Sequence, residues 1–287
     1  MRFGWLMAAA VMLAPGAALA QTSCGQYDFA RPYVGSFLQG ETFADAAKAV
    51  ETITTMADGA CHQDEVLALM AAAYGDVVGY KAAATSPGAQ KQLGLDGPVL
   101  GVLFDGMVLG DGATVPVTDG ARMIFELDLL VRVGDPALAK ATTRAEALAG
   151  IDAFIPFIEL GDLMVPKGVP VTGPLLQAMN AGGRLGVRGA PVSTAGMTVA
   201  SLDDSAGILM KDGAVVAEAP ASSLLGHPLD AVLWIAEATR ARGMALKTGD
   251  LLSLGSMGRF QLASAGKIAA EYTGFGPEPA TVSLTLE

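Results

Sequence analysis

The chain has 287 residues and a formal net charge of −11, and 52% of its residues are hydrophobic. This length can build one large domain or two smaller ones, and a charged fraction of only 16% argues against a disordered chain. The acidic balance, without any basic run, argues against nucleic acid and anionic lipid as partners.

Residues 1–20 have the pattern of a secretory signal peptide. Arg2 supplies the positive start, residues 3–13 the apolar core, and residues 18–20 the small side chains before a cut at Gln21. A membrane anchor is the alternative, but the apolar stretch is short for one. No later segment is long and apolar enough to cross a bilayer. The mature chain is therefore expected to be exported, to the periplasm, and to be free of the membrane.

The two cysteines, Cys24 and Cys61, both follow the predicted cut. In an exported protein such a pair most simply forms one disulfide. Closing a loop of about 37 residues would stabilise the fold by at most roughly 3–4 kcal/mol. A reactive thiol or a metal site is the alternative, but no third thiol or neighbouring motif supports it.

Residues 21–76 are predicted to form a helical N-terminal region, with helix over residues 40–76. Phe43 to Val50 repeats apolar positions at helical spacing, and Asp64 is expected to cap a second helix that runs through Met70. Residues 77–81 then have the composition of a strand.

Residues 77–287 are predicted to be one mixed, β-rich domain, which makes the chain an α+β protein. Gly and Pro recur at short intervals, and Asp212-Gly213 lies between two apolar runs as a hairpin turn. Three helices are expected between the strands. One is opened by the capping box of residues 143–146, a short one starts at Pro174, and one covers residues 229–242 with Pro228 in its first turn.

Three carboxylates lie in apolar runs: Glu126 and Asp128 within residues 123–131, and Glu159 within residues 157–160. Side chains alternate faces along a strand, so Glu126 and Asp128 project from the same face, with Cα atoms roughly 6.5–7 Å apart. Buried carboxylates are costly unless their charge is compensated. Oxygen ligands favour Mg²⁺, Mn²⁺ or Ca²⁺ over Zn²⁺, so this carboxylate trio is a candidate metal site.

A solvated strand face is the alternative for the trio, but apolar residues on both faces of the strand argue against it.

Lys81 lies in an apolar setting, where a lysine can have a lowered pKa and act as an acid or base; a surface lysine is the alternative. His62 and His227, the only histidines, are expected to have structural or capping roles.

Short motifs follow one another in order over roughly residues 40–285. They are Val78–Ser86, Leu93–Pro98, Gly101–Phe104, the strand with Glu126 and Asp128, Ile158–Asp162, Asn180-Ala181-Gly182, Gly226–Trp234, Lys247–Asp250 and Leu254-Gly255-Ser256. This ordered series resembles the 2-keto-4-pentenoate hydratases of the fumarylacetoacetate hydrolase superfamily.

The resemblance implies a mixed, β-rich fold around a divalent metal, Mg²⁺ or Mn²⁺, and a small 2-oxo acid as the bound molecule. The metal would polarise the 2-oxo group while a lysine moves a proton. The implied metal ligands are Glu126, Asp128 and Glu159, and the implied lysine is Lys81. Ser256 and Asn180 are expected to line the pocket, and a homo-oligomer is expected by analogy alone.

Several positions depart from the family pattern. Asp128 stands where Glu is usual and is one methylene shorter. Val99 replaces a proton-transferring Asp, and Met164 and Leu254 replace an Arg and a Thr. Three hypotheses follow: a periplasmic hydratase-like lyase acting on a 2-oxo or 2-hydroxydienoic acid, a catalytically degenerate protein that binds a 2-oxo acid or a partner, and an acylpyruvate hydrolase or decarboxylase on the same site.

Overall fold

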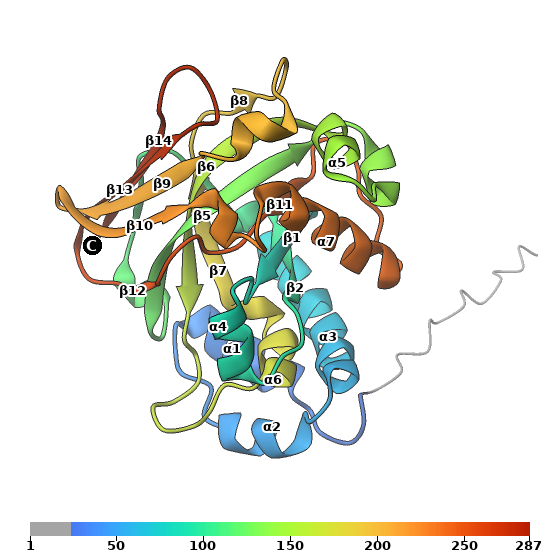
Figure 1. Cartoon of the computed structure of the whole chain (residues 1–287). Helices are drawn as coiled ribbons and strands as arrows, with labels where there is room; N and C mark the ends of the chain where they lie inside the picture. The colour runs from blue at the N-terminus through green and yellow to red at the C-terminus, as the bar shows by residue number, and fades with distance from the viewer. Residues whose placement is uncertain (1–23) are drawn as a thin grey trace, which may run out of the picture.

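The structure, a computed structural model, describes residues 24–287, so the predicted signal peptide at residues 1–20 lies outside the described residues. Helices and strands alternate along the chain in a mixed α and β architecture (Figure 1). The helices are α1 (Ala30–Gln39), α2 (Ala46–Thr52), α3 (Met56–Tyr74), α4 (Pro87–Leu93), α5 (Arg144–Gly150), α6 (Gly173–Ala178) and α7 (Pro228–Ala241). The strands are β1 (Val77–Ala83), β2 (Val99–Phe104), β3 (Val108–Gly110), β4 (Ala113–Val115), β5 (Met123–Val133), β6 (Ile151–Asp162), β7 (Gly183–Arg188), β8 (Val192–Ser193), β9 (Ala206–Lys211), β10 (Ala214–Pro220), β11 (Leu251–Ser253), β12 (Gln261–Leu262), β13 (Gly266–Thr273) and β14 (Ala280–Leu286).

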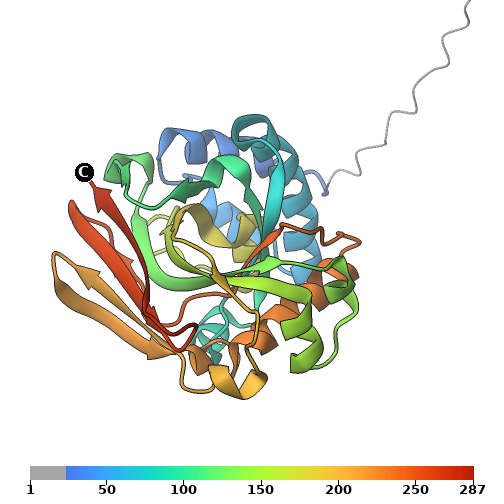
Figure 2. The same cartoon turned by 90° about the horizontal axis from the view of Figure 1, so that it is seen from above.

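Two sheets form the centre of the molecule. The larger sheet has the order β2-β1-β11-β5-β6-β7-β3, with β12 and β8 pairing to β5 and β6, and the smaller sheet has the order β10-β9-β13-β14-β4. The smaller sheet lies along one side of the long strands β5 and β6 (Figure 2). Both long strands are apolar on both faces and almost entirely buried, because the two sheets and the helices cover them.

The N-terminal helices α1, α2 and α3 pack as a group below the larger sheet in Figure 1, beside α6. Buried aromatic side chains hold α1 in place, with Tyr33 stacked on Phe29 and Phe43 edge-on to both. Helix α1 lies within residues 21–76, which were predicted to be helical, but ahead of residues 40–76, where the helix itself was expected. The expectation for Asp64 was wrong: α3 begins at Met56 with a capping box from Thr55, and Asp64 lies inside it.

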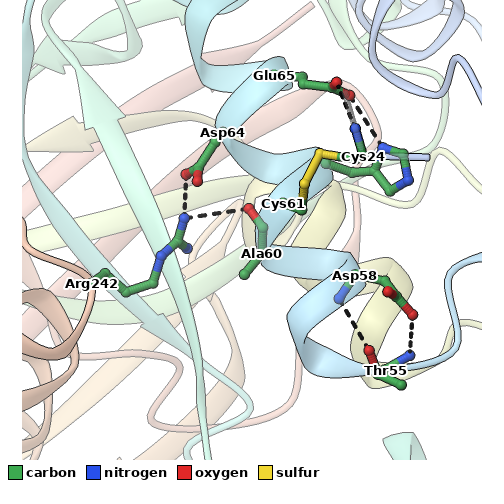
Figure 3. Close-up of a disulfide and its surroundings, with 9 residues drawn as sticks. Cys24, Thr55, Asp58, Ala60, Cys61, Asp64, Glu65 and Arg242 are labelled. Carbon is green, nitrogen blue, oxygen red and sulfur yellow. Dashed lines mark hydrogen bonds and ion pairs between the residues drawn. A yellow bond between two sulfur atoms is a disulfide. The ribbon is translucent and has the colours of Figure 1, made fainter. Parts of the chain in front are cut away.

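The predicted disulfide between Cys24 and Cys61 is present, with Cα atoms 5.6 Å apart (Figure 3). It ties the start of the described chain to α3. Glu65, one turn further along α3, accepts a hydrogen bond from the Cys24 backbone N–H at 3.3 Å. On another side of α3, Arg242 at the end of α7 binds the Asp64 carboxylate (Figure 3). Helix α3 is therefore joined both to the start of the described chain, at Cys24, and to the end of α7, at Arg242.

The local signals in the second part of the chain are largely confirmed. Thr143 and Glu146 form the expected capping box at the start of α5. Asp212-Gly213 is the turn between β9 and β10, with both residues at positive φ, where glycine is favoured. Pro228 opens α7, and Gly243 at φ 68° follows its end. Helix α4 is an addition to the three expected helices.

A buried ion pair connects the N-terminal helices to the larger sheet. Arg184 on β7 donates to Asp162 at the end of β6 across 2.8 Å, and to the Phe37 carbonyl of α1 across 2.8 Å. The guanidinium also lies over the Phe37 ring, 4.0 Å from its centroid.

Among residues 24–287, no helix combines the length and apolar character needed to cross a membrane.

Candidate metal and acid–base site

Glu126 and Glu159 lie directly opposite each other on the antiparallel strands β5 and β6. Side chains at such positions share a face of the sheet, with Cβ atoms about 4.5–5.5 Å apart. Asp128 is two residues further along β5, opposite Phe157, and therefore diagonal to Glu159. Glu126 is half-buried, while Asp128 and Glu159 are buried. The sheet thus gathers the carboxylate trio on one face, as the strand alternation predicts.

Lys81 reaches this face from β1, on the other side of β11 and β5 in the larger sheet. Its ammonium forms a buried ion pair with Glu159 Oε1 and donates to the Ala181 carbonyl across 3.3 Å. Two glycines leave room for the side chain. A Cβ at Gly101 would lie 2.6 Å from Lys81 Cγ, and one at Gly183 would lie 3.3 Å from Lys81 Cδ. Lys81 and Glu159, remote in sequence, are therefore direct partners.

Asp128 is fully buried, and both of its carboxylate oxygens accept hydrogen bonds. Ser253 Oγ donates to Oδ2 across 2.7 Å, and the backbone N–H groups of Gly255 and Leu129 donate to Oδ1 across 3.1 and 2.5 Å. The trio does not form a group whose ligand oxygens all lie within 4.8 Å of one another in the described residues.

The pKa values reflect the crowding of these groups. Burial lowers the pKa of Lys81, but the carboxylates around it, Glu159 first, more than offset this and hold it above its usual value. The expectation of a lowered lysine pKa therefore fails for this arrangement. Burial and the nearby Glu159 raise the pKa of Glu126 to about 8. Burial and Glu159 also hold the pKa of Asp128 well above its usual range, against the opposing hydrogen bond from Ser253.

The charge of the cluster suits a hard divalent cation. When all three carboxyl groups are ionised, they and the single ammonium carry a formal excess of two negative charges, which a divalent cation would neutralise. The raised pKa values of Glu126 and Asp128 show how unfavourable that charge is without a cation. Glu126 and Glu159, opposite each other, offer the all-oxygen donors that Mg²⁺ and Mn²⁺ prefer. The residues present therefore fit such an ion, with the pair Glu126 and Glu159 as its best-placed ligands.

Asn180 and Ser256, the two expected pocket residues, have other partners. Asn180 is fully buried; its Oδ1 accepts from the Val102 N–H at 2.8 Å and from Gln63 Nε2 at 3.1 Å, and its Nδ2 donates to the Val102 carbonyl at 2.9 Å. A direct contact between Asn180 and a substrate would have to break this set. Ser256 is half-buried and donates to the Gly258 carbonyl at 2.9 Å. Both assignments stay predictions.

The three apolar departures from the family pattern are buried. Val99 and Leu254 are 0% exposed and Met164 is 1% exposed. Polar side chains are absent at those positions, so the proton-transfer and substrate-clamping groups expected there from the resemblance have no equivalent in these residues. Asp162, two residues before Met164, binds Arg184 from the neighbouring strand.

The histidines have the expected structural roles. His62 is buried beside Tyr27 and Phe29, and its Nδ1 lies 3.2 Å from Glu65 Oε2. His227 caps α7, with Nδ1 accepting from the Leu229 N–H across 3.1 Å.

Ser253, Gln63 and Tyr272 are three residues near the site that sequence reasoning missed. None belongs to a motif that would have pointed to it. Ser253 binds Asp128, Gln63 binds Asn180, and the Tyr272 hydroxyl binds the main-chain carbonyls of Asp128 and Phe157 from the smaller sheet. All three act across long sequence separations.

Comparison with solved structures defines the fold. The fold is similar to that of 4-oxalocrotonate decarboxylase from Pseudomonas putida G7, in a structure complexed with magnesium and adipate, with a TM-score of 0.78 and 23% identity over 90% of this chain and 95% of that chain. It is also similar to fumarylpyruvate hydrolase from Pseudomonas aeruginosa in complex with Mn²⁺ and pyruvate, with a TM-score of 0.51 and 13% identity over 72% and 89% of the two chains. The fold is that of the fumarylacetoacetate hydrolase superfamily.

Sequence relatives then give the family. The chain is 31% identical over 207 residues to a 2-keto-4-pentenoate hydratase of Burkholderia vietnamiensis, which covers 71% of this chain and 78% of that protein. It is 30% identical over 223 residues to the TodF product hydratase of Pseudomonas putida, covering 77% of each. No family model matches the sequence. The chain belongs to the 2-keto-4-pentenoate hydratase family, whose named members are hydro-lyases.

Proposed function

We propose that this protein is a periplasmic hydro-lyase that adds water to a 2-hydroxydienoic acid or a related 2-oxo acid with the help of Mg²⁺ or Mn²⁺. The observation that carries the proposal is the placement of Glu126 opposite Glu159 with Lys81 bound to Glu159. A bound divalent cation would polarise the 2-oxo group and favour enolisation. Homologues named as hydratases support the choice of reaction.

The protein's own part in the reaction centres on Lys81. Its ammonium is held in an ion pair with Glu159, so Lys81 would deliver a proton at the start of a cycle. Glu159 and the Ala181 carbonyl fix the direction of the ammonium. The buried walls of β5 and β6 exclude bulk water, which strengthens each charge interaction in the site.

A direct assay tests this proposal. The purified mature chain is expected to bind Mg²⁺ and to convert a 2-hydroxydienoate to its hydrated product, with the loss of the diene absorbance as the readout and chelator-treated protein as the control. Absence of both metal binding and turnover would reject the proposal.

Decarboxylation is a second candidate reaction on the same site. A 4-oxalocrotonate decarboxylase of Pseudomonas putida is 25% identical over 206 residues, and a protein of that name shares the fold. Release of carbon dioxide from a 2-oxo diacid, without water addition, would favour the decarboxylase. Release of pyruvate would favour an acylpyruvate hydrolase.

Binding without catalysis is supported by a different observation, the buried apolar residues Val99, Met164 and Leu254. A degenerate member would keep the metal and a 2-oxo acid but lack the groups that complete proton transfer. Thermal stabilisation by oxalate plus Mg²⁺ with no turnover of any tested acid would favour this reading, and turnover would reject it.

The pattern of residues 1–20 and the disulfide of Cys24 with Cys61 support export to the periplasm. Cell fractionation and N-terminal sequencing would find a periplasmic chain that starts at Gln21. A cytoplasmic chain that retains residues 1–20 would contradict export. Assembly as a homo-oligomer stays a prediction by analogy, which light scattering would measure.

A further inference from the structure

We propose that Asp128 is a positioning residue that meets the cation only through a water molecule, and that Glu126 and Glu159 are the direct protein ligands. This inference rests on the proposed metal-dependent function. It separates the trio into a directly opposed pair and a third carboxylate that is already committed to other partners.

The hydrogen bonds of Asp128 carry the argument. Its Oδ2 accepts from Ser253 Oγ, and its Oδ1 accepts from the N–H groups of Gly255 and Leu129, so both oxygens already have protein donors. Hydrogen bonds to a carboxylate are charge-assisted and strong. Because Asp128 is 0% exposed, turning its carboxylate away would leave the buried Ser253 hydroxyl and two buried N–H groups without their acceptor.

Movement of the backbone cannot bring Asp128 closer to the cation. The Tyr272 hydroxyl, reaching across from the smaller sheet, binds the main-chain carbonyls of both Asp128 and its cross-strand neighbour Phe157. Strand β5 also pairs with β6 on both sides of Asp128, from Met123 to Val133. The strand is therefore held from both sides at the position of Asp128.

Side-chain length closes the argument. Aspartate is one methylene shorter than the glutamate expected from the resemblance, and Asp128 lies diagonal to Glu159 instead of opposite it. A bridging water can span the remaining gap between the Asp128 carboxylate and the cation. Asp128 would thus orient a water on the cation, and Ser253 and Gly255 would orient Asp128.

Binding of Mn²⁺ as the probe, with the exchangeable water on the ion counted by water-proton relaxation, tests this assignment. The wild-type protein is expected to retain about four waters on a six-coordinate ion held by two glutamates. In E126Q and E159Q, Mn²⁺ affinity should fall at least about 30-fold, because each change removes a direct ligand. In D128N it should fall less than about fivefold.

The variant D128E is the sharpest comparison, because it restores the length needed for direct contact. It is expected to bind Mn²⁺ with about one water fewer than the wild type. An unchanged water count in D128E, or a loss of affinity in D128N equal to that in E126Q, would overturn the inference. Circular dichroism and thermal melting establish that each variant is folded. If neither Asp128 variant folds, the wild-type count decides, and three or fewer waters would overturn the assignment.

These outcomes are separate from failure of the proposed function. A wild-type protein that binds no Mn²⁺ would remove the metal site itself. Wild-type binding combined with equal losses in D128N, E126Q and E159Q would leave the metal site intact and remove only the indirect role of Asp128.

Discussion

Gln63 of α3 donates a hydrogen bond to the side-chain oxygen of Asn180 across 3.1 Å, and the same Asn180 side chain bonds both polar groups of the Val102 backbone on β2. Asn180 and Ala181 are held at positive φ, 52° and 57°, and the Ala181 carbonyl accepts from Lys81. The contact therefore connects the N-terminal helices to the backbone turn against which the site lysine is positioned.

Replacing Asn180 with Ala should lower the free energy of unfolding by about 2–4 kcal/mol, because it leaves the buried N–H and C=O of Val102 without their side-chain partner and removes one hydrogen bond of Gln63. Urea unfolding followed by circular dichroism measures the change. Gln92→Ala, at an exposed position of α4, is the control and should change stability by less than about 0.5 kcal/mol. Equal effects of the two changes would show that the Asn180 network contributes nothing.

Breaking the disulfide should destabilise the protein. Replacing Cys24 and Cys61 with Ser removes a link between residues separated by 37 positions, with a loss of at most roughly 3–4 kcal/mol. Urea midpoints with and without reductant measure it. Reductant should lower the midpoint of the wild type and leave that of the double variant unchanged. A wild-type midpoint insensitive to reductant would mean that the bond is absent or adds no stability.

Gly101→Ala tests the space reserved for Lys81. The added methyl would lie 2.6 Å from Lys81 Cγ and 2.9 Å from Ala181 Cβ, so the lysine must move and stability should fall by about 1–3 kcal/mol. Gly110→Ala is a matched control on β3, where a Cβ meets nothing within 4 Å. Turnover should fall with the first change only. Comparable melting temperatures and turnover for the two variants would contradict the packing described for Lys81.

Lys81→Met should separate metal binding from catalysis. It removes the ammonium that pairs with Glu159, so turnover is expected to fall by about 10²–10⁴ if Lys81 moves a proton. Mg²⁺ affinity should not fall, because Glu159 loses a competing cation. Calorimetry and the hydration assay measure the two quantities on one preparation. Retained turnover would remove Lys81 from the acid–base role.

Acid pH should weaken the cap of α7. Burial, and then the nearby Arg144, lower the pKa of His227 below its usual value of 6.5, against opposing effects of Asp230 and Asp203. The unfolded chain therefore binds more protons than the folded chain as pH falls below about 6.5, and stability decreases there. Protonation would also remove the acceptor for the Leu229 N–H. His227→Asn, which can still cap a helix, should lose stability less steeply between pH 7 and 5. If the melting temperatures of the wild type and of His227→Asn fell equally between pH 7 and 5, this prediction would be contradicted.

Helix α1 shows why the position of some helices was not predicted. It has no side-chain cap, and Gly35 lies in its middle, so the local sequence carries few helix signals. Its stability comes from burial of Tyr33, Val34 and Phe37 against the rest of the molecule. By contrast, the capping box at Thr143 and the turn at Asp212-Gly213 act within a few residues and were predicted correctly.

The sequence by itself determined the local elements with strong caps and turns, the shared strand face of Glu126 and Asp128, and the family to which the chain belongs. Only the tertiary structure decided that Glu159 lies opposite Glu126, that Lys81 pairs with Glu159, and that Ser253 holds the Asp128 carboxylate. The physical reason is range. Caps, turns and strand alternation depend on neighbouring residues, whereas these contacts depend on strand order and register, which join residues 33 to 125 positions apart.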